Sequence, residues 1–236
     1  MRWVVVAACV AWMGLTQIAQ AQSLSPDSSP NPDAPVYVVT YLDILPPAKN
    51  AAIALLKQVR DACRKEDGNV RCEFVQRMER QNQFALLEVW QNQKAYAAHG
   101  SAPATVQWRD KLKPSLNSPI DERVHTAFSV QPPQLPPSGR IVYVVTHVDA
   151  IPPRAGDAAT ALTNMAEAGR RDPGAGRLEV LQQLAPKTDH FTLIEIWTNR
   201  KVLEAHQMTP GYIQYRDALQ PALEALYDER LFKLPD

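Results

Sequence analysis

The sequence contains few cysteines and glycines, and it has no excess of charge of either sign. Only 3 cysteines and 9 glycines occur among its 236 residues. That is too few for a disulfide-dense scaffold, and no glycine-rich nucleotide-binding loop is present. The 25 basic and 25 acidic residues give a formal net charge of +0, without long blocks of one sign. This balance gives no indication of a nucleic-acid partner or of an anionic membrane partner.

Long apolar runs and metal-binding motifs are also scarce. The one extended apolar run, from Trp3 to Ile18, is interrupted by Gly14, Thr16 and Gln17. Because a membrane-spanning helix needs about 20 apolar residues, we expect no membrane anchor. The 5 histidines and the later cysteines show no HExxH, paired CxxC or facial-triad spacing, so we expect no metal site.

The N-terminal segment has the pattern of a bacterial secretory signal peptide. Arg2 precedes the apolar run, and Ala19-Gln20-Ala21 forms an A-x-A cleavage signal. We therefore predict a signal peptide at 1–21 and export to the periplasm or the medium. In an exported chain Cys63 and Cys72, which flank the turn-forming stretch KEDGN, could form a disulfide or remain two buried thiols.

The chain contains an internal repeat. YVVTYLDILPP at 37–47 matches YVVTHVDAIPP at 143–153, and FALLEVWQNQKAYAAH at 84–99 matches FTLIEIWTNRKVLEAH at 191–206. Two copies are too few for a solenoid, so each copy must be a small domain. We predict the following division: a proline-rich leader at 22–35, a first domain at 36–130, a proline-rich linker at 131–140 and a second domain at 141–236.

Each copy has the same predicted order of elements, β-α-β-β-α-α-β. Pro46-Pro47 opens the first helix, as proline does in a first turn, and strands dense in Val, Leu, Ile and aromatics surround it. This order is that of a ferredoxin-like α+β unit with an extra helical turn. In the second copy Gly169 and Leu178 replace Cys63 and Cys72, so both cysteines are absent together, as expected for a bonded pair.

The stretch EIWTNRKVLEAHQMTPGYIQYRDAL at 195–219 resembles the antibiotic biosynthesis monooxygenase (ABM) family, especially its quinol-monooxygenase-like members. The resemblance covers 36–130 and 141–234, and EVWQNQKAYAAHGSAP in the first copy is a weaker version of the motif. It implies the dimeric α/β barrel fold, in which two ferredoxin-like units pack their sheets together. Here the two repeats would form this barrel within one chain, a pseudo-dimer. Separate domains, dimers between chains or further oligomerisation are the alternatives.

The resemblance also implies an activity. Family members oxidise electron-rich phenols and quinols with O₂, often without metal or flavin, so we expect a small aromatic or quinol-like substrate and no cofactor. Histidine suits the base of such a reaction. His206 matches the family's Ala-His-x-x-(Ser/Thr)-Pro motif together with Thr209 and Pro210, and is the first candidate. His99 is the second candidate, because Ala102 replaces the threonine in its copy.

Other residues are candidates for the substrate pocket, each with an ordinary structural alternative in core packing or ion pairing. They form four pairs related by the repeat, namely Trp90 and Trp197, Tyr41 and His147, Trp108 and Tyr215, and Arg109 and Arg216. Glu88 and Glu195 lie two residues before the strand-end tryptophans, on the same strand face. A carboxylate on a covered sheet face needs a partner, so we expect ion pairs across the barrel with Arg109 and Arg216.

Three further hypotheses frame the function. Haem-degrading relatives have an axial histidine on the third helix and an asparagine on the first strand. In this chain the region of the axial histidine holds Trp108-Arg109 or Tyr215-Arg216. The region of the asparagine holds Thr40-Tyr41 or Thr146-His147. These differences argue against haem degradation. The alternatives to a monooxygenase are a non-catalytic module that binds an apolar small molecule, and a structural or interaction protein that has lost the site.

Overall fold

The computed structural model describes residues 31–132 and 140–235. The predicted signal peptide, most of the leader and most of the linker lie outside these residues. None of the helices within the described residues combines the length and the apolar content needed to cross a membrane.

The two repeats fold in the same order of elements, which confirms the predicted α+β organisation. The first contains β1 (Val36–Asp43), α1 (Lys49–Cys63), β2 (Asn69–Arg77), β3 (Gln83–Trp90), α2 (Gln93–Ser101), α3 (Pro103–Leu112) and β4 (Asp121–Ser129). The second contains β5 (Val142–Asp149), α4 (Ala155–Gly169), β6 (Ala175–Gln183), β7 (His190–Trp197), α5 (Arg200–Gln207), α6 (Pro210–Leu219) and β8 (Asp228–Lys233).

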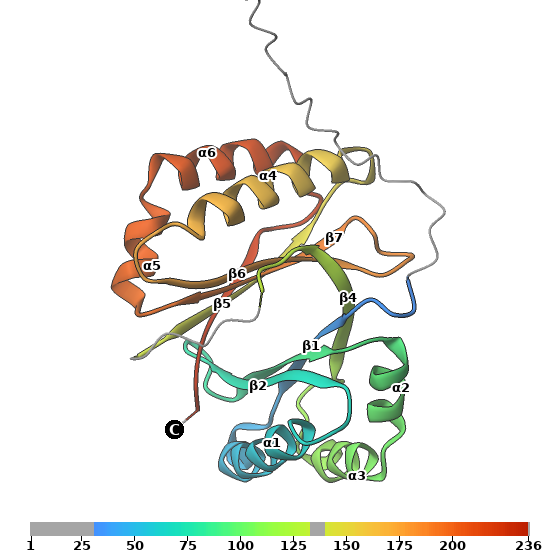
Figure 1. Cartoon of the computed structure of the whole chain (residues 1–236). Coiled ribbons are helices and arrows are strands. Elements are labelled where there is room, and N and C mark those ends of the chain that lie inside the picture. Colours follow the sequence, from blue (N-terminus) through green and yellow to red (C-terminus); the bar gives the residue numbers. More distant parts are fainter. Residues whose placement is uncertain (1–30, 133–139, 236) are drawn as a thin grey trace, which may run out of the picture.

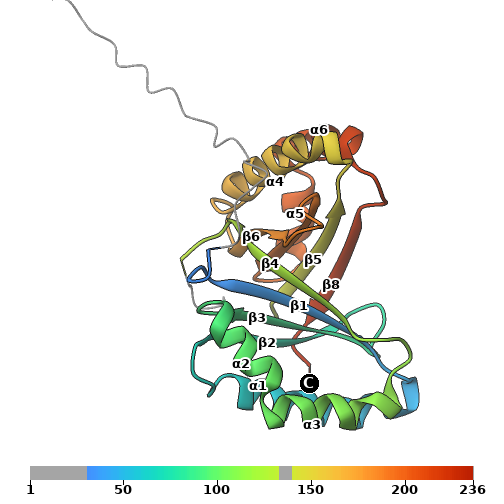
Figure 2. The same ribbon diagram turned by 90° about the vertical axis from the view of Figure 1, so that its right-hand side faces the viewer.

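The eight strands close into one barrel in the order β1-β3-β2-β8-β5-β7-β6-β4. The last strand of each repeat makes the closure. β4 pairs with β1 of its own repeat and with β6 of the other, while β8 pairs with β5 and β2. Closure leaves no open sheet edge in the barrel. The barrel is therefore the intrachain pseudo-dimer expected from the tandem repeat, with the helices of the two repeats on opposite sides (Figures 1 and 2).

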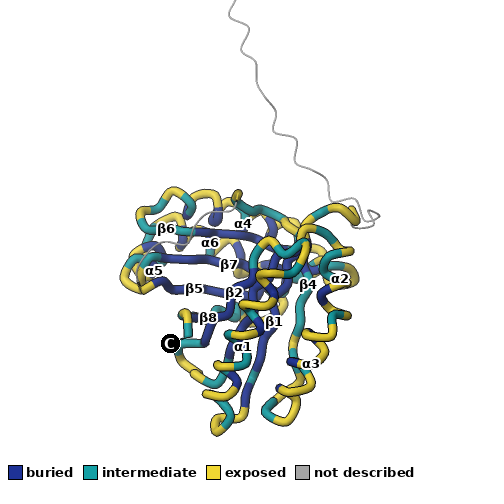
Figure 3. The backbone as a smooth tube through the Cα atoms, turned by 60° about the horizontal axis from the view of Figure 1, so that its bottom comes forward, coloured by how far each residue is buried: buried dark blue, intermediate teal, exposed yellow. Residues whose placement is uncertain are grey.

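The strand pleat sends alternate side chains to two different cores. On β5, Val142, Val144 and Val148 pack under the helices of the second repeat, while Tyr143 and Val145 point into the barrel. The barrel core mixes side chains from both repeats, whereas the helix-covered cores belong mainly to one repeat each. The strands are accordingly the most buried part of the chain (Figure 3).

Two turns place the histidine-bearing helices over the sheet. Gly68 and Gly174 precede β2 and β6 with φ of +79° and +83°, which only glycine adopts without strain. A Cβ on Gly68 would meet the Ala95 Cβ at 2.5 Å, so the turn also lies against α2. The α2 and α5 helices begin at Asn92 and Asn199, whose side chains accept the backbone N–H of the third helical residue.

Candidate functional site

His206 lies on α5, and its ring is enclosed by aromatic side chains. The ring centroid is 4.5 Å from that of Trp197 and 5.2 Å from that of Tyr212. Nδ1 is 2.6 Å from Asp172 Oδ2, whereas Nε2 is buried and has no hydrogen-bond partner among the described residues. The carboxylate thus fixes the ring through one nitrogen and leaves the other unpaired.

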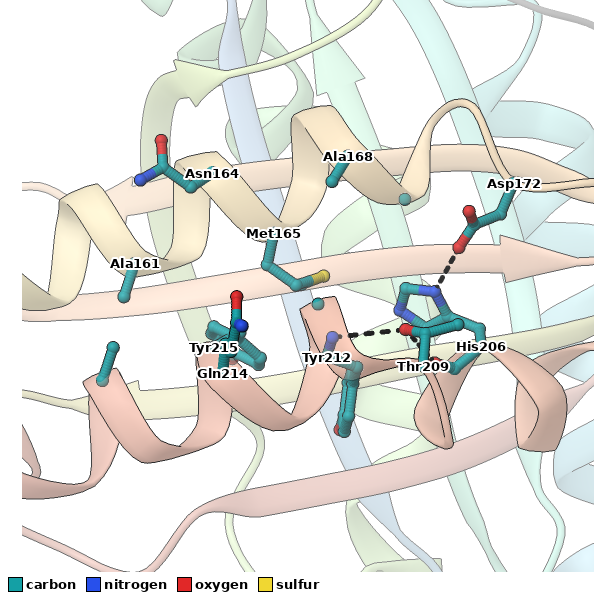
Figure 4. A pocket seen from close by; sticks show the side chains of 13 residues that line it. Ala161, Asn164, Met165, Ala168, Asp172, His206, Thr209, Tyr212, Gln214 and Tyr215 are labelled. Carbon is teal, nitrogen blue, oxygen red and sulfur yellow. Dashed lines mark hydrogen bonds and ion pairs between the residues drawn. The ribbon is translucent and has the colours of Figure 1, made fainter.

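A cavity of about 520 Å³ adjoins this histidine, between α4 and α6 (Figure 4). His206, Asp172, Tyr212, Tyr215 and Met165 line it. The remaining lining is largely of small side chains, which leave the space open: Ala161, Ala168, Gly169, Gly211 and Ala218. The volume lies in the range of small-molecule sites, so this is the candidate active site of the second repeat.

The Thr209 side chain forms hydrogen bonds with the backbone on either side of the turn between α5 and α6. Its hydroxyl donates to the His206 carbonyl oxygen at 2.7 Å and accepts the Tyr212 backbone N–H at 3.2 Å. It is therefore the N-cap of α6 and joins that helix to the end of α5. Ala102, at the corresponding place in the first repeat, makes no side-chain cap for α3.

The first repeat holds a smaller version of the site. His99 stacks on Trp90 with ring centroids 4.5 Å apart, and its Nδ1 is 2.8 Å from Glu66 Oε2 and 3.3 Å from Thr105 Oγ1. Its Nε2 is 3.7 Å from Glu88 Oε2. The adjoining cavity is about 160 Å³ and is lined in part by Trp108. Both ring nitrogens of His99 thus face carboxylates, and little space remains beside them.

Asp172 and Glu66 are the site residues that the motif analysis did not identify. They occupy equivalent places in the turn after the first helix of each repeat, directly before Pro173-Gly174 and Asp67-Gly68. An acidic residue that recurs at one repeat position, together with a recurring histidine, is the signal that could have revealed the pairing.

The expected ion pairs of Glu88 and Glu195 with Arg109 and Arg216 are wrong. Both glutamates lie on the helix-covered face of the sheet, and each accepts the indole N–H of the tryptophan two residues later, at 2.9 Å. Arg109 pairs with Glu122, and the Arg216 guanidinium lies 3.6 Å over the Tyr227 ring. Burial raises the pKa of Glu195 to about 8, with a smaller rise from Glu229 and an opposing effect of the Trp197 hydrogen bond.

The ion pairs that do cross the barrel use other residues. Arg71 of the first repeat binds Glu179 of the second at 2.7 Å, and Arg177 of the second binds Glu73 of the first at 2.5 Å. These four side chains point into the barrel because they alternate with the outward-facing residues of β2 and β6.

The structure separates the remaining candidates. Trp197 and Trp90 pack beneath the two histidines, Tyr215 lines the larger cavity and Trp108 the smaller one. Tyr41 and His147 instead point into the barrel, away from both cavities, and Arg109 and Arg216 line neither. Tyr41 lies under the guanidinium groups of Arg123 and Arg230. Burial, assisted by the charge of Arg123, lowers the pKa of His147 to about 4.

Cys63 and Cys72 are buried, free cysteines in the structure. Their sulfur atoms lie within 4.8 Å of each other and of a Glu88 carboxylate oxygen. The disulfide is not formed here and stays a prediction, although the two thiols are adjacent as it requires. These three side chains, and a second group of His147, Asp149 and His190, are the described clusters whose ligand atoms could hold a metal ion.

The model of the antibiotic biosynthesis monooxygenase family matches residues 35–111 and 141–218. The match covers more than half of the chain and falls on both repeats, so the chain belongs to this family and is a tandem, monooxygenase-like member of it. No curated protein sequence matched the chain.

Solved structures share the tandem fold. A candidate monooxygenase from Fusobacterium nucleatum superimposes with a TM-score of 0.77 at 10% identity, covering 86% of this chain and 93% of that one. A candidate monooxygenase from Lactobacillus acidophilus NCFM gives 0.69 at 13% identity, covering 84% and 93%. An anthrone oxidase-like protein gives 0.68 at 11% identity, covering 86% and 92%. At these identities the likeness concerns the fold.

Proposed function

We propose that the His206 cavity is the active site of an exported, cofactor-independent monooxygenase that oxidises a small aromatic or quinol-like substrate with O₂. The observation that carries the proposal is the His206–Asp172 pair beside the larger cavity. Asp172 holds the proton on Nδ1, so the unpaired Nε2 is the nitrogen left to act as the base. Nε2 is buried in the free protein, so a substrate hydroxyl reaches it only when the side chains that cover it shift. A base of this kind contributes roughly 10²- to 10⁴-fold to a proton transfer.

The chemistry needs no external reductant. Nε2 of His206 removes the proton of a substrate hydroxyl, and the resulting phenolate is electron-rich enough to reduce O₂. For a naphthol, one oxygen atom then enters the ring as a quinone carbonyl. The other leaves as water with the hydroxyl proton and the displaced ring hydrogen. The substrate supplies all four electrons, so the reaction balances as naphthol plus O₂ giving naphthoquinone plus water.

Two features of the cavity favour an anionic intermediate. The first turn of α6, through Gly211 and Tyr212, borders the cavity, and the positive end of a helix dipole stabilises a nearby anion. Glu195 lies beneath Trp197, and its raised pKa of about 8 keeps it largely uncharged at neutral pH. Glu195 therefore adds no negative charge beneath the site to oppose the phenolate.

The test is oxygen uptake by purified protein, with hydroquinones, naphthols and anthrone offered in the presence of a chelator. Anthrone is included because one fold neighbour is described as anthrone oxidase-like. His206→Ala should reduce uptake by at least about 100-fold, as expected for loss of a base. The matched variant His99→Ala should leave uptake near the wild-type rate, because its cavity is about 160 Å³. Equal uptake by wild type and His206→Ala would refute the assignment of the base.

A binding module without turnover is the second candidate function, favoured by the aromatic and apolar side chains around the cavity. It predicts that a naphthol raises the melting temperature of the wild-type protein and that no oxygen is consumed.

Export is tested separately, by the mass of the protein recovered from the periplasm or the medium. A mature chain that begins at Gln22 supports it, and an intact N-terminus in the cytoplasm contradicts it.

A further inference from the structure

One end of the barrel interior brings together two histidines and an aspartate from two strands. His147 and Asp149 lie two residues apart on β5, so both point to the same face of the strand. His190, the first residue of β7, is directly opposite Asp149 in the strand register. One ligand atom from each of the three side chains lies within 4.8 Å of the other two.

The close contacts in this cluster are not hydrogen bonds. His147 Nε2 is 2.6 Å and His190 Nδ1 is 2.7 Å from the same oxygen, Asp149 Oδ1. That oxygen is nevertheless buried without a hydrogen bond from any described residue. The ring N–H directions therefore do not point at the carboxylate, although the atoms are close. Three donor atoms thus converge without hydrogen bonding to one another. Widening the 2.6 and 2.7 Å spacings to about 3.3 Å would place all three about 2.0 Å from one ion in tetrahedral geometry.

The surrounding charges leave a deficit of positive charge at this point. Arg123 forms an ion pair with Asp121, and Arg230 forms one with Asp228, so each pair has no net charge. The carboxylates of Asp149 and of Asp189 remain beside the imidazoles; Asp189 Oδ1 is 3.7 Å from His190 Nε2. A carboxylate behind a histidine ligand is a common outer contact in metal sites, and two remaining negative charges match a divalent cation.

We propose that His147, Asp149 and His190 form a binding site for a first-row divalent transition metal such as Zn²⁺. Two imidazole nitrogens and one carboxylate oxygen suit these ions rather than Mg²⁺ or Ca²⁺, which prefer oxygen ligands. The Asp149 and His190 side chains are 24% and 22% exposed, so the cluster borders solvent. An ion reaches the buried Asp149 Oδ1 through a small movement of these two side chains and can keep water ligands.

The site is separate from the proposed active site. The His206 ring lies against Trp197, which pairs with Val142 at the far end of β5, seven residues before Asp149. Seven residues of strand correspond to roughly 24 Å, and His206 is on the helix-covered face rather than inside the barrel. Metal binding and oxygen uptake can thus succeed or fail independently.

The first repeat provides a built-in control. Tyr41, Asp43 and Gln83 occupy the equivalent positions, and Asp43 accepts ordinary hydrogen bonds from Asn82 at 3.1 Å and Gln83 at 3.0 Å. The same carboxylate is therefore satisfied by amides in one repeat and faces two imidazoles in the other. His190→Gln and His147→Tyr replace each ligand with the residue that the first repeat tolerates.

The experiment is calorimetric titration of untagged protein with ZnCl₂, together with Co²⁺ absorption spectra and melting curves. Wild type should bind one ion. His190→Gln and Asp149→Asn should melt normally without metal and should lose affinity by at least about 100-fold, because outer-sphere changes alone cost 10- to 100-fold. The Co²⁺ spectrum should lack thiolate charge-transfer bands.

Three results would overturn the proposal. They are no binding by wild type, unchanged binding by His190→Gln, and thiolate bands that place the ion at Cys63 and Cys72 instead. His147→Tyr is interpreted only if its melting curve shows a folded protein, since His147 is buried. If His147→Tyr does not fold, the His190→Gln variant still tests the proposal, because His190 is partly exposed and its replacement should leave the fold intact.

Discussion

Arg71 of the first repeat and Glu179 of the second form a two-point ion pair inside the barrel. Arg71 Nη1 is 3.1 Å from Glu179 Oε1, and Nη2 is 2.7 Å from Oε2. Arg177 and Glu73 repeat the pair with the roles of the repeats exchanged. The chain thus carries, within one molecule, the reciprocal contacts that a symmetric dimer makes between two.

Removing one partner of this network should destabilise the whole barrel. Glu179→Gln leaves the guanidinium groups of Arg71 and Arg177 to share the single carboxylate of Glu73. The uncompensated positive charge should cost about 3–5 kcal/mol of unfolding free energy. Urea unfolding of wild type and variant measures this. Asp110→Asn breaks an exposed pair with Lys113, and should change stability by less than about 1 kcal/mol. Equal effects of the two variants would show that the barrel pairs do not hold the repeats together.

A methyl group at Gly169 should disturb the candidate base. A Cβ there would stand 2.7 Å from Leu178 Cδ2 and 3.1 Å from His206 Cε1, so the imidazole must move. We expect Gly169→Ala to lower oxygen uptake several-fold while the protein stays folded.

Gly156→Ala on the same helix is its control, since a Cβ there meets nothing within 4 Å. It should keep full uptake and change stability by less than about 0.5 kcal/mol, because Gly156 is in the first turn of α4 and a methyl group there meets open space. A Gly169→Ala variant with wild-type uptake would argue against a fixed His206 ring as the base.

Glu195 should make the protein less stable as the pH rises. Its pKa is about 8 in the folded protein and near 4.5 when exposed. Between these values the unfolded chain releases this proton and the folded protein keeps it, so unfolding is favoured progressively from about pH 4.5 to pH 8. Glu195→Gln keeps an acceptor for the Trp197 indole but cannot ionise.

Melting curves at pH 5 and pH 8 test this. The melting temperature of Glu195→Gln, relative to wild type, should be higher at pH 8 than at pH 5. The same difference at both pH values would mean that Glu195 is ionised in the folded protein.

The two cysteines predict a redox state. If Cys63 and Cys72 are bonded after export, the protein denatured without reductant should show no reactive thiol. With reductant added, two thiols should appear. Two titratable thiols without reductant would dispose of the disulfide and leave the pair as buried thiols.

The sequence predicted the helix and strand order because those signals are local. Segments dense in Val, Leu, Ile and aromatics and the Pro-Pro helix start each act within a few residues, and the repeat doubles both signals. His206, Trp197 and Tyr215 came with the family motif. The structure brings His206 and Tyr215 to one cavity and packs Trp197 against the His206 ring.

Partners distant in sequence were not predictable in this way. Asp172 precedes His206 by 34 residues, and the two meet only because the turn after α4 lies beside α5. Glu195 and Glu179 both lie among apolar residues of a predicted strand, so the sequence does not distinguish them. In the structure Glu195 faces the helices and Glu179 faces the barrel interior. The ion pair across the barrel that was expected for Glu195 is therefore made by Glu179.

By itself, the sequence determined the two α+β repeats, their common element order and the histidine motif in each. The tertiary structure alone decided which carboxylates meet which histidines and arginines. Strand pleat and barrel closure choose the face and the neighbour of every charged side chain, and neither is encoded within a short window of sequence. The larger cavity beside His206 and the cluster of His147, Asp149 and His190 both arise from that choice.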